Sequence, residues 1–512
     1  MISPLDIAIV VIYLAGCIAA GLLSRGSRAN TQEYFTAGGG MGSAFGTLIV
    51  GLSIAATLFS GISFINYPSV VYSSGVLLFI GIAFVCMPAA YVILRWWFLP
   101  RYLASGCVFP YDVVEHRFGA NPRVIASILY VLMRIGWMAT MIYAPTLAIM
   151  AMARVDPHNS AAFWTIVLVT GLSSTVYTVF AGIRGVIVTD AIRMMVIAIG
   201  IAMTIGFALY HLPVPLGLAF DDLRASGRLE WREFSLDPTR PFTFWTVAIG
   251  ITVANLSNYL ADQMSLQRYL ATGNARAACR SFVVNVIGVL LVLALLAGVG
   301  LSLFVFYSHV DDPSLPTKTD QIFPHFVATR LPVGLCGLLL AALLAATMSS
   351  LTSGINALAG VLTLDFRERF GPPMHDAQKL RFAKLASLAI GLAATLSAGL
   401  VAQLGTLFDA TQVILGVFAG PLLSCVVLSV TTVRCGGLAM AVGLIAGAAL
   451  GIAVRAYSPV AVLWIAPIAA ATTAVLAVGL TPLLGSRRWG VRSVPRVSKP
   501  PPAASVSAAN DA

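Results

Sequence analysis

Thirteen long apolar runs follow one another along almost the whole chain, and they restrict what it can fold into. They cover about 5–24, 44–72, 76–103, 123–151, 160–181, 187–210, 243–270, 277–308, 329–364, 380–402, 407–432, 435–456 and 459–484. Most are close to, or longer than, the stretch of about 20 residues that a helix needs to cross a bilayer. Only helices and closed barrels satisfy every backbone polar group in lipid. We therefore expect an all-α, polytopic membrane protein with about 13 transmembrane helices.

The composition is also typical of a polytopic membrane protein, with 59% hydrophobic residues, 10% charged residues and a mean hydropathy of +0.91. The net charge of +11 is unevenly placed, because 21 of the 31 Lys and Arg residues fall in inner segments if the N-terminus is outside. This positive-inside bias predicts an external N-terminus and a cytoplasmic C-terminus. The expected location is the plasma membrane, here a bacterial inner membrane. The basic excess therefore reflects topology, and the expected partner is the lipid bilayer and not a nucleic acid.

The ninth apolar run carries four hydroxyl side chains near its middle, Ser349, Ser350, Thr352 and Ser353. On a helix, three of them share one face with Ala346. One reading is ordinary, since Ser and Thr hydroxyls commonly join membrane helices or bond to carbonyls one turn earlier. The other is coordination of a hard cation such as sodium, which prefers oxygen ligands.

The second apolar run favours the cation reading because small and polar residues gather at its centre. Thr57, Ser60, Gly61 and Ser63 lie there, and Asn66 follows. Such a cluster is typical of an unwound transmembrane helix, whose freed carbonyls coordinate a cation and whose half-helix ends face a substrate. Tight helix packing is the alternative for Ser53 and Gly61.

The seventh apolar run is also unusually polar. It contains Asn255, Ser257, Asn258, Asp262, Gln263 and Gln267. It holds the same place in spans seven to eleven as the second run holds in spans two to six, which predicts inverted repeats with a site at the bilayer midplane. The resulting division is a transmembrane domain, 1–485, and a disordered cytoplasmic tail, 486–512. The domain comprises a leading helix at 5–24, repeats at 44–210 and 243–432, and two additional helices at 435–484.

Motifs spread over nearly the whole chain carry a resemblance to a known family. They include Glu33-Tyr34-Phe35, Gly51-Leu52-Ser53, Gly182-Ile183-Arg184-Gly185, Gln267-Arg268-Tyr269 and the stretch from Ala346 to Asn356. With them the chain resembles the sodium:solute symporters, which have a LeuT-type fold of inverted five-helix repeats with an extra leading helix. It is most similar to the branch of bacterial sialic acid symporters and animal iodide, monocarboxylate and vitamin symporters.

The resemblance implies sites for Na+ and for a small-molecule substrate. The main sodium site would use the backbone carbonyls of Ala56, Phe59 and Ala346 and the hydroxyls of Ser349 and Ser350. A second sodium site, present in some relatives, would use Ser349, Asp190, Thr352 and Ser353. The substrate would lie near Thr57, Ser60, Ser63, Trp137, Asn258 and Gln263.

Two departures from the family pattern involve arginine. Sialic acid symporters have a substrate-binding arginine where this chain has Trp137, and here Arg134 lies one turn away. An arginine in mid-span costs about 2.5–3.5 kcal/mol on insertion scales, so Arg134 is a candidate substrate contact. The alternative is a pair with a nearby carbonyl or carboxylate. Trp137 either packs or stacks on substrate, and Asp262 is expected to form a gate or loop pair near the inner end of its span.

The second departure is Arg193, where many relatives have glutamine. It follows Asp190 by three residues, a spacing that lets the two side chains pair on one helix. Alternatively Arg193 snorkels to the cytoplasmic surface, and Asp190 is either a helix N-cap or an ion ligand. If Arg193 pairs with Asp190, its guanidinium supplies the positive charge that a second sodium ion would bring. Such a pair predicts one sodium ion per substrate. If Asp190 is free of such a pair, a stoichiometry of two sodium ions per substrate remains the alternative.

These features predict a sodium-coupled secondary active symporter that imports a small organic solute and functions as a monomer. An organic anion such as a monocarboxylate or acidic sugar is the expected solute. The alternatives are a sodium symporter for a neutral solute and a symporter-like membrane sensor module, although the tail is short for a signalling domain. A membrane enzyme would need His, Asp or Glu clustered at one membrane face. The sequence shows no such cluster, so we expect no enzyme.

Overall fold

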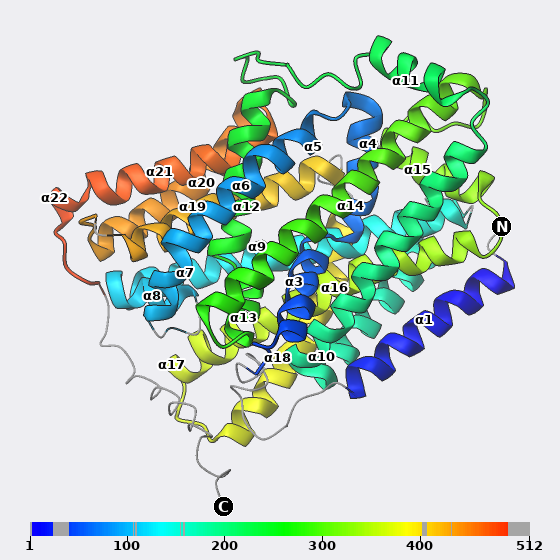
Figure 1. Ribbon diagram of the computed structural model, residues 1–512. Helices are drawn as coiled ribbons and strands as arrows, with labels where there is room; N and C mark the ends of the chain where they lie inside the picture. Colours follow the sequence, from blue (N-terminus) through cyan, green and yellow to red (C-terminus); the bar gives the residue numbers. More distant parts are fainter. Residues whose placement is uncertain are drawn as a thin grey trace, which may run out of the picture.

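The computed structural model describes residues 3–23, 40–105, 107, 110–153, 155–156, 159–401, 407–431 and 433–489. Helices are the regular structure in these ranges, with no strand among them, which confirms the all-α class (Figure 1). Ten helices there are long and apolar enough to cross a membrane, or 11 if one bent pair counts as a single span. The predicted number of 13 is therefore not confirmed.

The difference in number comes from two of the predicted spans. The leading helix α1 (Pro4–Leu23) is apolar, but its qualifying part, Pro4–Ala20, is short. The predicted seventh span is divided into a π-helical turn (Thr246–Ile251), α12 (Thr252–Leu260) and α13 (Gln263–Ala271). Neither α12 nor α13 is long enough to cross a bilayer alone.

The second predicted span is broken as the sequence suggests. It consists of α3 (Ala44–Leu58) and α4 (Gly61–Ser74), whose axes are bent by 66°. Phe59 and Ser60 between them have extended backbone conformations, and the Ser60 hydroxyl caps α4 by accepting from the Ser63 N–H. Because a helix end leaves its last carbonyls without helical partners, the break directs free carbonyl oxygens into the bundle.

A second break separates α12 from α13, and Asp262 forms it. Its extended backbone (φ −96°, ψ 126°) ends one helix, and its side chain caps the next by accepting from the Met264 N–H at 2.8 Å. Asp262 therefore lies at the interruption itself, a position that the sequence did not assign to it.

Helix α16 (Leu335–Val361) is the most buried of the candidate spans, with 83% of its apolar window inside the bundle. It packs against α3, α4, α10 (Ser160–Tyr210), α9 (Ala120–Met152), α13 and α18 (Asp376–Val401). Helix α10 is continuous but contains two candidate membrane spans, Ser160–Val179 and Ile183–Tyr210. Figure 1 shows α16 inside the bundle and α1 on one flank, where α1 packs against α10 and α16.

The remaining helices complete the bundle and its two ends. They are α5 (Leu77–Gly81), α6 (Met87–Val92), α7 (Leu99–Ala104), α8 (Pro110–Phe118), α11 (Leu216–Ala225), α14 (Ala275–His309), α15 (Thr319–Arg330), α17 (Glu368–Phe370), α19 (Leu407–Val430), α20 (Gly437–Tyr457), α21 (Ile465–Gly479) and α22 (Thr481–Leu484). In Figure 1, α11 and α15 lie at one end of the molecule and α8 and α17 at the other.

The start of the predicted disordered tail is ordered. The Trp489 N–H donates to the Phe118 carbonyl at 2.8 Å, and the Gly437 N–H donates to the Arg487 carbonyl at 2.9 Å. The expectation of disorder therefore does not hold for Arg487 and Trp489, which bond to α20 and α8. Residues 490–512, and the Glu33-Tyr34-Phe35 motif, lie outside the described ranges.

Candidate functional site

The break between α3 and α4 faces the hydroxyl row of α16. The Ser350 hydroxyl donates to the Thr57 carbonyl at 2.9 Å and lies 3.4 Å from the Phe59 carbonyl. Both carbonyls belong to the end of α3 or to the break, where helical partners are missing. Three oxygens thus converge in a fully buried place. Ala56 and Ala346, which we expected to contribute carbonyls, are buried on the same two helices.

Ser349, the neighbour of Ser350, faces a different group. Its hydroxyl donates to Oδ1 of Asp190 on α10 at 2.8 Å. The same carboxylate accepts hydrogen bonds from Nη1 of Arg193 at 3.1 Å and from Nη2 of Arg268 at 2.9 Å. All four side chains are fully buried, so α16, α10 and α13 are joined by charged hydrogen bonds inside the bundle.

We call Asp190, Arg193, Arg268 and the hydroxyls around them the charged cluster. The hydroxyl members are Ser53, Thr57, Ser349, Thr352 and Ser353. The cluster excludes two of the sequence alternatives. Asp190 lies inside α10 and caps no helix, and Arg193 is buried against Asp190 and does not snorkel.

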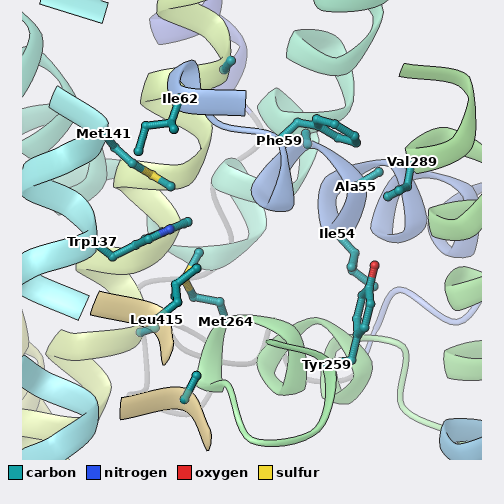
Figure 2. Packing of buried hydrophobic residues seen from close by; sticks show 14 of the residues in the cluster. Ile54, Ala55, Phe59, Ile62, Trp137, Met141, Tyr259, Met264, Val289 and Leu415 are labelled. Carbon is teal, nitrogen blue, oxygen red and sulfur yellow. The ribbon is translucent and has the colours of Figure 1, made fainter. Parts of the chain in front are cut away.

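A polar cavity lies on the other side of the α3–α4 break. Its wall is formed by α3, α4, α9, α12, α13 and α19. Thr57, Ser60, Ser63, Asn66, Asn255, Asn258, Ser265 and Gln412 supply polar groups, and Ile62, Trp137, Met141, Met264 and Leu415 supply apolar surface. Figure 2 shows Met141 beside Ile62, with Trp137 below Met141 and with Leu415 and Met264 below Trp137. A cavity that combines apolar surface with convergent polar groups is typical of a small-molecule site.

An ion pair forms one end of this cavity. Arg134 and Asp262 are both buried, and Nη2 of Arg134 contacts the Asp262 carboxylate. The guanidinium lies 4.3 Å from the centre of the Trp137 ring, and the Tyr130 hydroxyl donates to Asp262 at 3.0 Å. The expected alternatives are thus combined, because Arg134 reaches the cavity and also pairs with a carboxylate. Its Nε has no hydrogen-bond partner among the described residues.

Thr57 belongs to both regions. Its side chain lines the cavity and lies 3.3 Å from the Ser353 hydroxyl, while its carbonyl accepts from Ser350. Any ion that changes the position of the α3–α4 break must therefore also move one wall of the cavity.

Six of the seven expected substrate residues line the cavity, and one does not. Thr57, Ser60, Ser63, Arg134, Trp137 and Asn258 are in its wall. Gln263 is outside it, and both of its amide atoms are buried without a hydrogen-bond partner in the described part of the chain. Met264 and Ser265 line the cavity in its place. The break at Asp262 sets the rotation of α13, and sequence periodicity cannot carry that rotation across the break.

Sequence reasoning missed the role of Arg268. Its side chain is fully buried and bonds to Asp190, Ser53 and Ser353. One signal was present, because Arg268 follows the most polar part of an apolar run, where a charge requires a partner.

The family assignment follows from the comparison of sequences. Residues 34–447 match the pattern of the sodium:solute symporter family. The chain belongs to the sodium:solute symporter family. The resemblance drawn from the motifs is therefore confirmed, and the family's members that it matches are transporters and not enzymes.

Several members of the family are similar along most of this chain. The sodium/sialic acid symporter NanT of Aliivibrio fischeri is 27% identical over 86% of this chain and 86% of its own length. The human sodium/iodide cotransporter is 28% identical over 84% of this chain and 66% of its own length. The sodium-coupled monocarboxylate transporter 2 of Danio rerio is 29% identical over 73% of this chain, but the match spans only 59% of that longer protein.

Solved structures confirm the fold. A Na+-coupled sialic acid symporter in a substrate-bound, outward-open state superposes with a TM-score of 0.82 at 24% identity, covering 94% of this chain and 98% of that one. A nucleobase-cation-symport-1 family transporter gives a TM-score of 0.57 at 14% identity, covering 86% and 92%. The expected LeuT-type fold is therefore correct.

Proposed function

We propose that this protein is a sodium-coupled secondary active symporter for a small organic solute. The observation that carries the proposal is the α3–α4 break, whose free carbonyls meet the Ser350 hydroxyl beside a polar cavity. Sodium would bind at this convergence with carbonyls of Ala56, Phe59 and Ala346 and hydroxyls of Ser349 and Ser350. Hydroxyl and carbonyl oxygens suit a hard cation.

Coupling follows from the position of Thr57. A sodium ion between α3 and α16 would hold the break in the arrangement that shapes the cavity wall. The ion then favours the conformation that binds solute, and by linkage the solute favours sodium to the same degree. Both sites lie within one chain, which supports a monomer as the functional unit.

An organic anion is the solute class that we propose. Arg134 reaches the cavity with an Nε that lacks a partner among the described residues, and a guanidinium binds a carboxylate through a two-pronged fork. Relatives are named for sialic acid, monocarboxylates and iodide, all of which are anions or ionise to anions. A neutral solute is the second candidate, because Asp262 already balances the charge of Arg134.

Uptake into proteoliposomes tests the function and the solute class. With an inward sodium gradient, radiolabelled carboxylates should accumulate, and unlabelled carboxylates should compete where neutral sugars do not. Arg134→Lys keeps the positive charge beside Asp262 but removes the fork, so we expect the KM for a carboxylate to rise by roughly tenfold, about 1.4 kcal/mol.

The matched control for Arg134→Lys is Arg240→Lys, because Arg240 is exposed, pairs with the exposed Glu233 and is not among the described residues that line the cavity. It should leave the KM unchanged. Competition by neutral sugars and not by carboxylates would contradict the anion assignment. Uptake that is independent of the sodium gradient for every solute tested would contradict sodium symport itself.

From the charge bias we propose that the protein lies in a bacterial inner membrane with its N-terminus outside and its C-terminus in the cytoplasm. Ser314 and His375 are both exposed, and they lie in loops predicted on opposite sides. In intact cells, a membrane-impermeant thiol reagent should label Ser314→Cys and spare His375→Cys. The reverse labelling pattern would overturn the orientation.

A further inference from the structure

The charged cluster has the oxygen-rich composition of a cation site. Asp190 contributes a carboxylate, and five hydroxyls surround it from α3 and α16, those of Ser53, Thr57, Ser349, Thr352 and Ser353. All of these side chains are buried. Carboxylate and hydroxyl oxygens are the ligands that a hard cation prefers. What occupies the centre of the cluster decides whether a second ion can bind.

The lone pairs of Asp190 are already used. A carboxylate offers about four acceptor positions. Four donors lie within 3.1 Å: Arg193 and Ser349 on Oδ1, and Arg268 and Ser53 on Oδ2. A sodium ion would have to displace at least one of these donors in order to bind the carboxylate.

Two of the remaining oxygens face the same guanidinium groups. Ser353 accepts from Nη2 of Arg268 at 2.6 Å, and Thr352 lies 3.5 Å from Nη1 of Arg193. The ring of Tyr177 lies 5.2 Å from the Arg193 guanidinium carbon and adds a cation–π contact on another side. Arg193 therefore already fills the place beside Asp190 and Thr352 that an added cation would need.

The charge balance points the same way. Two guanidinium groups against one carboxylate leave the described cluster with a net charge of +1 before any ion binds. Adding sodium would raise it to +2 in a buried environment, where like charges repel strongly. Without Arg193 the cluster would be neutral and would keep its oxygens.

We propose that Arg193 is a built-in cation that takes the place of a second sodium, so that this symporter binds a single sodium ion at the Ser350 site. This inference rests on the proposed sodium coupling. Because Arg193 cannot dissociate, its charge stabilises the contact between α10 and α16 in every state but draws no energy from the sodium gradient. A one-sodium symporter accumulates solute less steeply than a two-sodium one under the same gradient.

Binding of radioactive sodium to the purified full-length protein tests the proposal without a known solute. We expect one saturable site and a Hill coefficient near one in the wild type. Arg193→Gln should show two saturable sites, whereas Arg193→Lys, which keeps the charge, should retain one. In the Ser350→Ala, Arg193→Gln double variant, the new site should remain when the first is weakened.

The outcomes separate the two claims. Two sodium sites in the wild type would overturn the built-in cation, and this result does not depend on whether any Arg193 variant folds. One site in folded Arg193→Gln would also overturn it. A wild-type protein that binds no sodium would instead refute the proposed sodium coupling. Ser387→Ala is the matched control, because among the described residues that buried hydroxyl bonds only to Ala383 of its own helix, at 2.9 Å, and it should leave sodium binding unchanged.

Discussion

Replacing Asp190 with alanine is expected to destabilise the helix bundle by about 3–5 kcal/mol. The carboxylate is shared by Arg193 and Arg268, both fully buried, and its removal leaves two like charges together without compensation. Solvent cannot reach the site to screen them. The measurement is the thermal unfolding midpoint of the purified protein in detergent, together with the yield of monodisperse protein.

A charge-balanced double variant shows whether electrostatics causes the loss. Asp190→Asn raises the net charge of the cluster from +1 to +2, and the further change Arg193→Gln returns it to +1. We therefore expect the double variant to be more stable than Asp190→Asn alone. Asp237→Ala is the control, because its carboxylate is exposed and its ion pair with Arg240 is long, at 4.0 Å. If Asp190→Ala and Asp237→Ala unfold at the same temperature, the cluster does not stabilise the bundle.

Ser350→Ala is expected to raise the sodium concentration needed for half-maximal uptake by at least about tenfold, which corresponds to about 1.4 kcal/mol of binding free energy. The substitution removes the hydroxyl oxygen that meets the carbonyls of Thr57 and Phe59 at the break. The apolar methyl group that replaces it cannot coordinate an ion. Sodium-dependent uptake in proteoliposomes, measured at saturating solute, gives this concentration directly.

Ser349→Ala should also raise the sodium requirement, but by less. The Ser349 hydroxyl bonds to Asp190 in the structure, so much of the effect of its loss falls on the charged cluster. The two serines are adjacent on one helix and equally buried, which makes them a matched pair. An unchanged sodium requirement in both variants, with folded protein, would show that sodium binds elsewhere.

The sequence by itself determined the class of the protein and the two spans whose helices break. Lipid requires apolar helices of sufficient length, so the apolar runs report spans directly. The mid-span polar residues around Ser60 predicted the first interruption, and the polarity of the seventh run favoured a second one without locating it at Asp262, because such residues are stable in a membrane only where the helix opens or finds partners. The pairing of Asp190 with Arg193 was also within reach, since a three-residue spacing on one helix is a local property.

Only the tertiary structure decided which groups meet across helices. Arg268 reaches Asp190 over 78 residues of chain, and Arg134 meets Asp262 from another helix, so no local spacing encodes either contact. Gln263 lies outside the cavity wall because the break before it sets the rotation of α13. Trp489 was assigned to a disordered tail because its ordering depends on a bond to Phe118, far away in the sequence. Local chemistry fixes where a helix spans or breaks, whereas the packing of distant helices fixes which buried charges become neighbours.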